Sequence, residues 1–292
     1  MKYNLAFKYR IYPNKEQELL INKTFGCVRF VYNTILYTAN KFYEETGKNK
    51  IITPASLKSE NQFLKEVDSL ALSNAQLNVK RSFTNFFQKR AKFPRFKSKK
   101  NNVKSYTTNC VNNSIRIEEN KYLVLPKLKR IKLKYHREIP KDYKIKSVTL
   151  TNSNGNYYVS VLTEFEKEIQ KIPSNDKVIG LDFSMSELFV SSENQRADYP
   201  RYFRMLEKKL KKLQKSLSRK VKFSKNWYKQ KMKISKLHEY IKNCRRDFLH
   251  KLSKKLSEAY NAVVVEDLNM KGMSQALNFG KSVGDNGWGM FL

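Results

Sequence analysis

Two short apolar segments of the sequence each carry an acidic residue near their C-terminal end. The first, 177–183, contains Asp182, and the second, 262–268, contains Glu266. Both segments predict buried β-strands, and a carboxylate is costly in such a strand unless it is paired or binds a cation. Two closely placed carboxylates can hold the divalent ions that activate water for phosphodiester cleavage. Asp182 and Glu266 are therefore our candidate catalytic and metal-binding residues.

Either acidic residue taken alone has a simpler explanation. A carboxylate at a strand end often caps a neighbouring helix. Asp182 and Glu266 lie 84 positions apart, so only the fold could bring them together. A strand meander followed by a helix and a parallel strand would do so. The two residues taken together, with a basic sequence between them, favour a cation site that acts on a polyanion.

The composition indicates a polyanionic partner. The 292 residues include 59 Lys and Arg against 26 Asp and Glu, for a net charge of +33. A low-GC genome explains many lysines but not so large an excess, and such a charge favours nucleic acid through release of its counterions. Residues 201–260 alone hold 21 basic and four acidic residues. Much of the charge excess therefore lies between the two acidic segments.

Ten basic residues are our candidates for contact with nucleic acid. They are Arg29, Lys89, Arg90, Arg95, Lys208, Lys212, Arg219, Lys229, Arg245 and Arg246. Phenylalanines alternate with basic residues over 83–96, a mixture that can stack on bases while the cations hold phosphates. The same phenylalanines could instead form the apolar face of a helix, and the sequence leaves both interpretations open.

The cysteine content argues against a zinc site. Cys27, Cys110 and Cys244 lie far apart and form no C-x-x-C pair, so we expect neither a disulfide framework nor bound zinc.

No segment approaches the roughly 18 apolar residues of a membrane span, and the N-terminus has no uninterrupted apolar stretch. We therefore expect a cytoplasmic protein with no membrane partner.

The N-terminal part predicts a strand followed by helices. Apolar residues fall on odd positions over 3–11, which is the two-residue period of a half-buried strand. Asn14 with Gln17 three residues later predicts a capping box at a helix start. Apolar residues at helical spacing then favour helices over much of 14–45 and 68–90.

Short β-rich segments follow from about 103 to 165. Asn154-Gly155 between alternating apolar segments predicts a β-hairpin. We interpret residues 1–165 as a small β-barrel with a helical insertion at about 14–95. A generic α+β module would also fit these patterns.

Residues 166–176 are polar, contain a proline and predict a linker. A second domain, 177–292, follows, with a second strand expected over 187–191. Residues 201–260 predict two long helices joined around 223–226. The fold class that these patterns indicate is an α+β or α/β multidomain protein.

Several sequence blocks resemble the TnpB family, the transposon-encoded proteins from which type V CRISPR effectors descend. They are Tyr9-Arg10-Ile11-Tyr12-Pro13 and the stretches 24–33, 180–185, 247–251 and 265–273, and they occur in family order across nearly the whole chain. The resemblance implies a wedge barrel with an inserted helical recognition domain over 1–165. It further implies a RuvC-like domain of the RNase H fold over 177–292.

The resemblance also implies partners and a cofactor. Family members bind a guide RNA, recognise a short motif beside a DNA target and cleave that target at a magnesium-dependent RuvC site. Asp182 matches the first aspartate of that site and Glu266 matches its glutamate. The basic helices of 201–260 would then lie along the guide–target heteroduplex.

The resemblance fails at the C-terminal end. Family members continue into a helix, a four-cysteine zinc ribbon and a third catalytic aspartate, whereas this sequence stops at Leu292. Asp285 does not replace the third aspartate, because it lies before the missing segment at a position suited to a helix cap. The apolar residues 287–292 predict a C-terminally truncated RuvC-like domain with uncovered apolar surface and an open sheet edge.

Three functions are compatible with these patterns. The first is a transposon-associated RNA-guided DNA endonuclease whose cleavage is impaired because the third carboxylate is missing. The second is a nuclease-dead RNA-guided DNA-binding repressor, although retention of Asp182 and Glu266 argues mildly against it. The third is a nonfunctional fragment.

Overall fold

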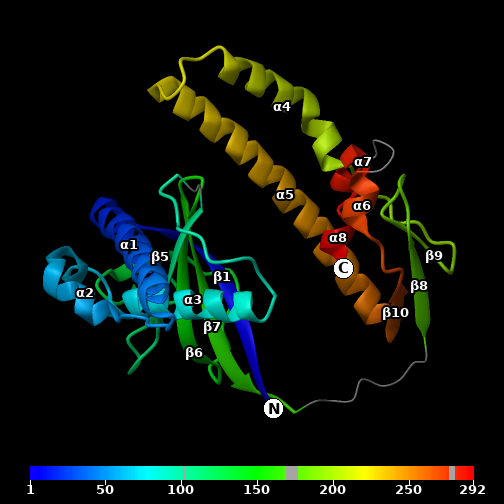
Figure 1. Cartoon of the computed structure of the whole chain (residues 1–292). Helices are drawn as coiled ribbons and strands as arrows, with labels where there is room; N and C mark the ends of the chain where they lie inside the picture. The colour runs from blue at the N-terminus through cyan, green and yellow to red at the C-terminus, as the bar shows by residue number, and fades with distance from the viewer. Residues whose placement is uncertain (101–102, 169–176, 276–279) are drawn as a thin grey trace. The chain divides into compact units, whose positions relative to one another are not determined.

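The computed structural model of this chain describes residues 1–100, 103–168, 177–275 and 280–292. The chain forms two compact units, Met1–Ile169 and Gln170–Leu292, which are described separately below (Figure 1). Most of the predicted linker, 166–176, lies outside the described residues. Both units combine helices and strands.

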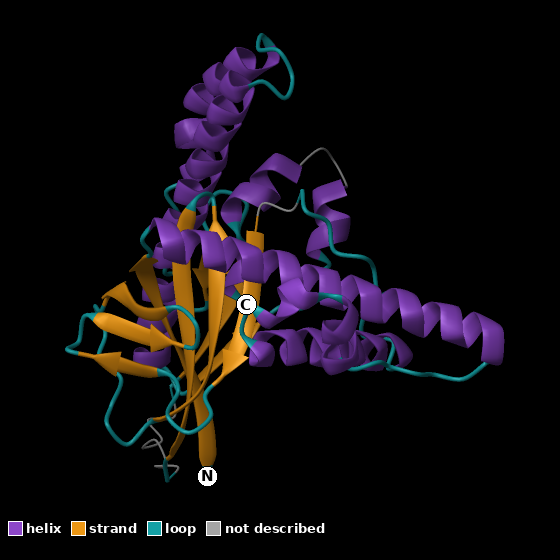
Figure 2. Cartoon of the chain, turned by 90° about the vertical axis from the view of Figure 1, so that its left-hand side faces the viewer, coloured by secondary structure: helices purple, strands orange, loops and turns teal. Residues whose placement is uncertain are grey.

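The first unit is built on a curled antiparallel sheet of seven strands, drawn in orange in Figure 2. Its spatial order is β2-β6-β7-β1-β5-β4-β3, so β1 is central and β2 and β3 form the two edges. The closed wedge barrel suggested by the sequence stays a prediction. The bounds of the strands are β1 Lys2–Tyr12, β2 Val103–Asn109, β3 Arg116–Glu118, β4 Tyr122–Leu125, β5 Lys129–Lys134, β6 Lys144–Ser153 and β7 Asn156–Glu166.

The strand predictions for this unit are confirmed. In β1 the odd positions face the core, and Phe7, Tyr9 and Ile11 are buried. The predicted hairpin joins β6 to β7, with φ of 52° at Asn154 and 80° at Gly155. Positive φ at both central residues is the conformation that an Asn-Gly hairpin turn supplies at little cost.

The helices of the first unit all lie between β1 and β2 in the chain. They are α1 Lys15–Thr46, α2 Pro54–Glu60, η1 Gln62–Lys65 and α3 Ser69–Phe87, which confirms the two predicted helices. The capping box at the start of α1 is present, since Asn14 Oδ1 accepts from the Gln17 N–H and Gln17 Oε1 accepts from the Asn14 N–H. Gly47 ends α1 with a φ of 66°.

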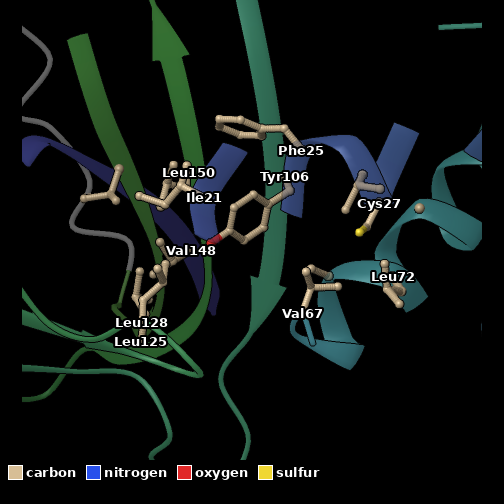
Figure 3. Packing of buried hydrophobic residues seen from close by; sticks show 14 of the residues in the cluster. Ile21, Phe25, Cys27, Val67, Leu72, Tyr106, Leu125, Leu128, Val148 and Leu150 are labelled. Atoms are coloured by element: carbon tan, nitrogen blue, oxygen red, sulfur yellow. The ribbon is translucent and has the colours of Figure 1, made fainter. Parts of the chain in front are cut away.

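One apolar core joins these helices to the sheet. Figure 3 shows Phe25 of α1 beside Tyr106 of β2, and their ring centroids lie 5.6 Å apart in an edge-to-face arrangement. Val148 and Leu150 of β6 belong to the same cluster, as does Leu72 of α3. The helical insertion is therefore packed on the sheet through a shared core.

The second unit contains a small mixed sheet with the order β10-β8-β9. Strand β8, Val178–Phe183, is antiparallel to β9, Phe189–Ser191, and parallel to β10, Ala262–Val265. The helices are α4 Tyr202–Ser218, α5 Lys225–Ala259, α6 Met270–Gln275, α7 Gly280–Asn286 and α8 Trp288–Phe291. The two long basic helices, α4 and α5, and the parallel return strand are thus confirmed.

The second unit corrects in part the expectation about the apolar end of the chain. Trp288 is fully buried among Ile179, Leu181 and Phe189 and fills the core of this unit. Met290 and Leu292 remain exposed, at 47% and 61% of their surfaces. Packing therefore explains the apolar character of Trp288, whereas other apolar side chains of 287–292 stay uncovered as expected.

Candidate active site

Strands β8 and β10 bring the two candidate carboxylates to one edge of the small sheet. The parallel register pairs Leu181 of β8 with Val265 of β10. Asp182 and Glu266 directly follow these two residues in the sequence. Neighbouring strands lie about 4.8 Å apart. The fold therefore supplies the proximity that a separation of 84 positions could not ensure, and both side chains are exposed where a substrate could reach them.

Strand β10 is less covered than its apolar sequence predicts. Every residue of β10 is exposed, and Val264 exposes 59% of its surface, whereas Ile179 and Leu181 of β8 are buried. The prediction of two buried strands is therefore wrong for β10. The physical reason is position, because β10 is an edge strand that pairs with β8 alone within the described part of the chain.

The turn after Asp182 is held by α7. Asn286 Nδ2 donates hydrogen bonds to the backbone oxygens of Ser184, at 2.8 Å, and Glu187, at 2.5 Å. The Glu187 carboxylate accepts from the hydroxyls of Ser186 and Ser184, and these bonds, with Arg196 contributing less, lower its pKa to about 2. Because Glu187 forms hydrogen bonds within this turn, the second strand begins at Phe189 and not at the predicted residue 187.

Asp285 has a structural role as a helix cap. Its side chain is buried and accepts from the backbone N–H groups of Phe203, at 3.1 Å, and Arg204, at 3.3 Å, in the first turn of α4. The residue before α4, Arg201, has a φ of 48° and provides no side-chain cap. Asp285 therefore caps α4 from a distant part of the sequence, in agreement with the expectation that it does not serve as a third catalytic acid.

The predicted contact residue Arg245 is engaged inside the protein. Its Nη2 lies 3.4 Å from Asp285 Oδ1 and its Nε donates to the Tyr199 hydroxyl at 3.0 Å. With 16% of its side chain exposed, Arg245 balances the buried Asp285 charge. We therefore assign Arg245 a structural role.

The other predicted nucleic-acid contacts lie on accessible surface of their units. Lys208, Lys212, Arg219, Lys229 and Arg246 are exposed on or beside α4 and α5, and Lys89, Arg90 and Arg95 are exposed in the segment after α3. Arg29 is half-buried on α1. The sequence did not single out Lys97 and Lys104, which share a groove with Arg29. Only the fold brings these three cations together.

The phenylalanines of 83–96 contact one another. Phe93 approaches Phe86 with ring centroids 5.2 Å apart and Phe83 at 6.0 Å, both edge to face. Phe87 and Phe93 still expose 64% and 48% of their surfaces. The segment is thus an aromatic cluster with an accessible outer face, which combines the two interpretations that the sequence left open.

The acidic set at the sheet edge suits magnesium. Mg²⁺ is usually held by one or two carboxylates while its other positions go to water and substrate phosphates. Asp182 and Glu266 supply two carboxylates, although no group of three or more His, Cys, Asp and Glu residues placed to hold a metal occurs among the described residues.

The described residues contain no helix with the length and apolar character needed to cross a membrane.

These features define a basic two-unit α/β protein with a pair of carboxylates at a sheet edge. Its sequence matches two families of the IS605 OrfB type, described as "Probable transposase" over residues 159–277 and "Helix-turn-helix domain" over residues 1–48. The chain belongs to this IS605 OrfB family, the TnpB proteins, as the sequence blocks suggest. In the structure, residues 1–48 hold β1 and the single helix α1, so this segment is a strand and one helix.

Two curated relatives support this assignment across the chain. "Putative RNA-guided DNA endonuclease InsQ" of Escherichia coli K12 is 36% identical over 287 residues, covering 94% of this chain and 69% of the relative. "Putative RNA-guided DNA endonuclease" of Streptomyces pristinaespiralis is 32% identical over 292 residues, covering 97% of this chain and 71% of the relative. The family is therefore established from sequence alone.

A solved structure shows the same fold. The protein of a Cas12f1–sgRNA–target DNA complex, determined by cryo-EM, superimposes with a TM-score of 0.54 over 99% of this chain and 87% of the other. Only 11% of the residues are identical. At that identity the likeness concerns fold, and it supports the mixed α/β architecture with a curled seven-stranded sheet.

Proposed function

We propose that this chain is a transposon-associated RNA-guided DNA endonuclease that uses Asp182 and Glu266 to hold magnesium. The observation that carries the proposal is the pairing of Leu181 with Val265, because it brings both carboxylates to one sheet edge. The names of the two curated relatives support the same activity. The second unit is then a RuvC-like domain of the RNase H type.

Each part of the second unit has a role in this proposal. Asp182 and Glu266 would hold the metal, which would activate water and stabilise the leaving oxygen of a phosphodiester. Asn286 holds the turn next to Asp182, so that this carboxylate keeps its place. The exposed cations of α4 and α5 contact the backbone of the guide RNA and target DNA, whose shape they read without regard to sequence.

The proposal includes weak cleavage by these 292 residues. Two carboxylates hold a metal less firmly than three, and the described residues contain no cluster of three potential ligands. We expect the purified chain, loaded with its guide RNA from the host cell, to bind DNA that matches the guide and to cut that DNA slowly or not at all. Robust cutting would show that the two carboxylates suffice.

The experiment has two steps. RNA that co-purifies with the chain is sequenced, and DNA carrying the matching sequence is then tested for binding and for cutting with magnesium or with a chelator. Asp182→Asn provides the control, since it leaves the basic helices intact. If no specific RNA co-purifies, or if the natural chain cuts the DNA and D182N cuts it equally fast, the proposed function is wrong.

The lack of a cluster of three potential metal ligands among the described residues leaves room for a second candidate, an RNA-guided DNA-binding repressor, although retention of Asp182 and Glu266 argues mildly against it. Binding requires the basic helices and not the acidic pair. Guide-dependent occupancy of a promoter without any magnesium-dependent cutting would support the repressor over the endonuclease. A chain that binds neither RNA nor DNA would support the nonfunctional fragment.

A further inference from the structure

The first unit contains a groove that combines three cations with two hydroxyls and an apolar wall. The basic groove encloses about 180 Å³ between α1, the segment after α3 and the edge strand β2. Its cations are Arg29, Lys97 and Lys104. They come from three separate parts of the chain, so only the fold assembles them.

These three cations have no acidic partner in the part of the chain that the structure describes. Among the residues that the structure describes, neither the Arg29 guanidinium nor the ammonium groups of Lys97 and Lys104 form an ion pair or donate a hydrogen bond. By contrast, Lys23, on the same helix as Arg29, pairs with Glu66. Three neighbouring cations without a carboxylate repel one another, and an anion in the groove would relieve that repulsion.

Lys97 is fixed in place. Asn33 of α1 donates from Nδ2 to the Lys97 oxygen at 3.0 Å and accepts the Lys97 N–H at 2.8 Å. The Lys97 ammonium lies 4.2 Å from the centroid of the Tyr32 ring. Although much of the residue is exposed, its ammonium end packs against protein, and this burial lowers the pKa of Lys97. A bound anion would favour the charged form of this amine.

The other groups of the groove suit a sugar. Ser98 accepts the Lys100 N–H, which leaves its own O–H available as a donor, and Ser105 of β2 also lines the groove. Phe25 and Val28 of α1 supply an apolar wall. A phosphate bound by the cations would thus have hydroxyl and apolar partners for the attached ribose.

We propose that the basic groove binds the sugar–phosphate backbone of a single RNA strand, with Arg29, Lys97 and Lys104 on the phosphates and Ser98 and Ser105 on ribose 2′-hydroxyls. The inference rests on the proposed function, because it assumes that the protein has an RNA partner. RNA is favoured over DNA because hydroxyl partners beside a phosphate site distinguish ribose from deoxyribose.

The test uses the full chain and a short single-stranded RNA of mixed sequence, with DNA of the same sequence as competitor. Arg29→Gln with Lys104→Gln removes two cations without changing side-chain bulk greatly. We expect about tenfold weaker RNA binding, and a plot of log affinity against log salt whose slope is about 1.4 less steep, at about 0.7 per lost phosphate contact. Ser98→Ala with Ser105→Ala should weaken RNA binding and leave DNA binding unchanged.

Lys48→Gln is the matched control. Lys48 is exposed and lies beyond Thr46, the last residue of α1, which is about 25 Å along the helix axis from Arg29, so the loss of Lys48 should leave the salt slope unchanged. If the natural chain binds RNA and the groove variants bind it equally well with the same slope, the groove assignment is wrong while the proposed function stands. If the natural chain binds no RNA, both are wrong.

A second measurement does not depend on the variants folding. Acetylation of lysines in the natural chain, followed by mass spectrometry, should show that bound RNA protects Lys97 and Lys104 but not Lys48. Equal modification of Lys97 and Lys104 with and without bound RNA would overturn the proposal. If DNA of the same sequence protects them equally, the RNA assignment is wrong and the site recognises phosphate alone.

Discussion

Leu181 of β8 and Val265 of β10 are paired in a parallel register. The pairing matters because each is followed directly by an acidic residue, Asp182 and Glu266. A slip of one residue along the strands would separate the two carboxylates and turn one of them to the opposite face of the sheet. The register therefore decides whether the chain has one acidic site or two unrelated acids.

The first prediction concerns metal binding at this edge. If the pair holds magnesium as proposed, the ion should raise the melting temperature of the natural chain, and Asp182→Asn and Glu266→Gln should each abolish that rise, because one carboxylate alone competes poorly with water for Mg²⁺. Asp267→Asn is the matched control, since it removes the same charge from the next position, whose side chain alternates to the other side in an extended chain. Equal loss in D267N would show that general negative charge, and not this pair, binds the ion.

The second prediction concerns the cap that Asp285 provides for α4. Asp285→Ala leaves the half-buried Arg245 without its partner and should cost about 3 kcal/mol of unfolding free energy. Hydrogen exchange should show faster exchange at the N–H groups of Phe203 and Arg204. Glu207→Gln, which breaks ion pairs to Lys211 and Lys281 on the surface, should have a much smaller effect. Unchanged protection in D285A would contradict the capping role.

The third prediction concerns pH. Glu187 has a folded-state pKa of about 2, below its ordinary value of 4.5, so its stabilising effect is complete above pH 4.5 and is lost as the pH falls toward 2. Carbon-detected NMR titration of its carboxyl should give the low pKa directly. Ser186→Ala and Ser184→Ala should each raise that pKa, with the larger rise in S186A. An ordinary pKa in the natural chain would show that the turn does not hold Glu187 in this way.

The fourth prediction concerns Trp288. Truncation of this fully buried side chain to Ala should cost about 3–5 kcal/mol of unfolding free energy by opening a cavity against Ile179 and Leu181. Trp288→Phe should cost only about 1–2 kcal/mol, since it also removes a buried N–H. The Trp288 Nε1 has no hydrogen-bond partner within the described residues. Urea unfolding of both variants checks the order, and an equal cost would contradict it.

The local features of the fold were predictable because their causes are local. The capping box of Asn14 and Gln17 needs only three residues of spacing, and the hairpin at Asn154-Gly155 needs only two residues that accept positive φ. The alternation that forms β1 follows from the period of a strand. Each of these could be predicted without knowledge of any distant contact.

The candidate site was predictable only in part. The types of Asp182 and Glu266 and the apolar segments before them indicated a possible cation site. The position of Asp285 suited a helix cap, but the sequence did not show that α4 is the helix it caps or that Arg245 points inward, because these partners lie 40 to 82 positions away. Charge alone could not separate a cation that contacts solvent from one that neutralises a buried acid.

The sequence by itself determined the family, the excess of positive charge and the two acidic strand ends, because these depend on residue identity and short-range spacing. Only the tertiary structure decided that β10 lies beside β8 in the register that aligns Asp182 with Glu266, and that β10 is an exposed edge. It also decided that Arg29, Lys97 and Lys104 share one groove. Strand pairing and groove formation depend on contacts between distant segments, which residue spacing does not specify.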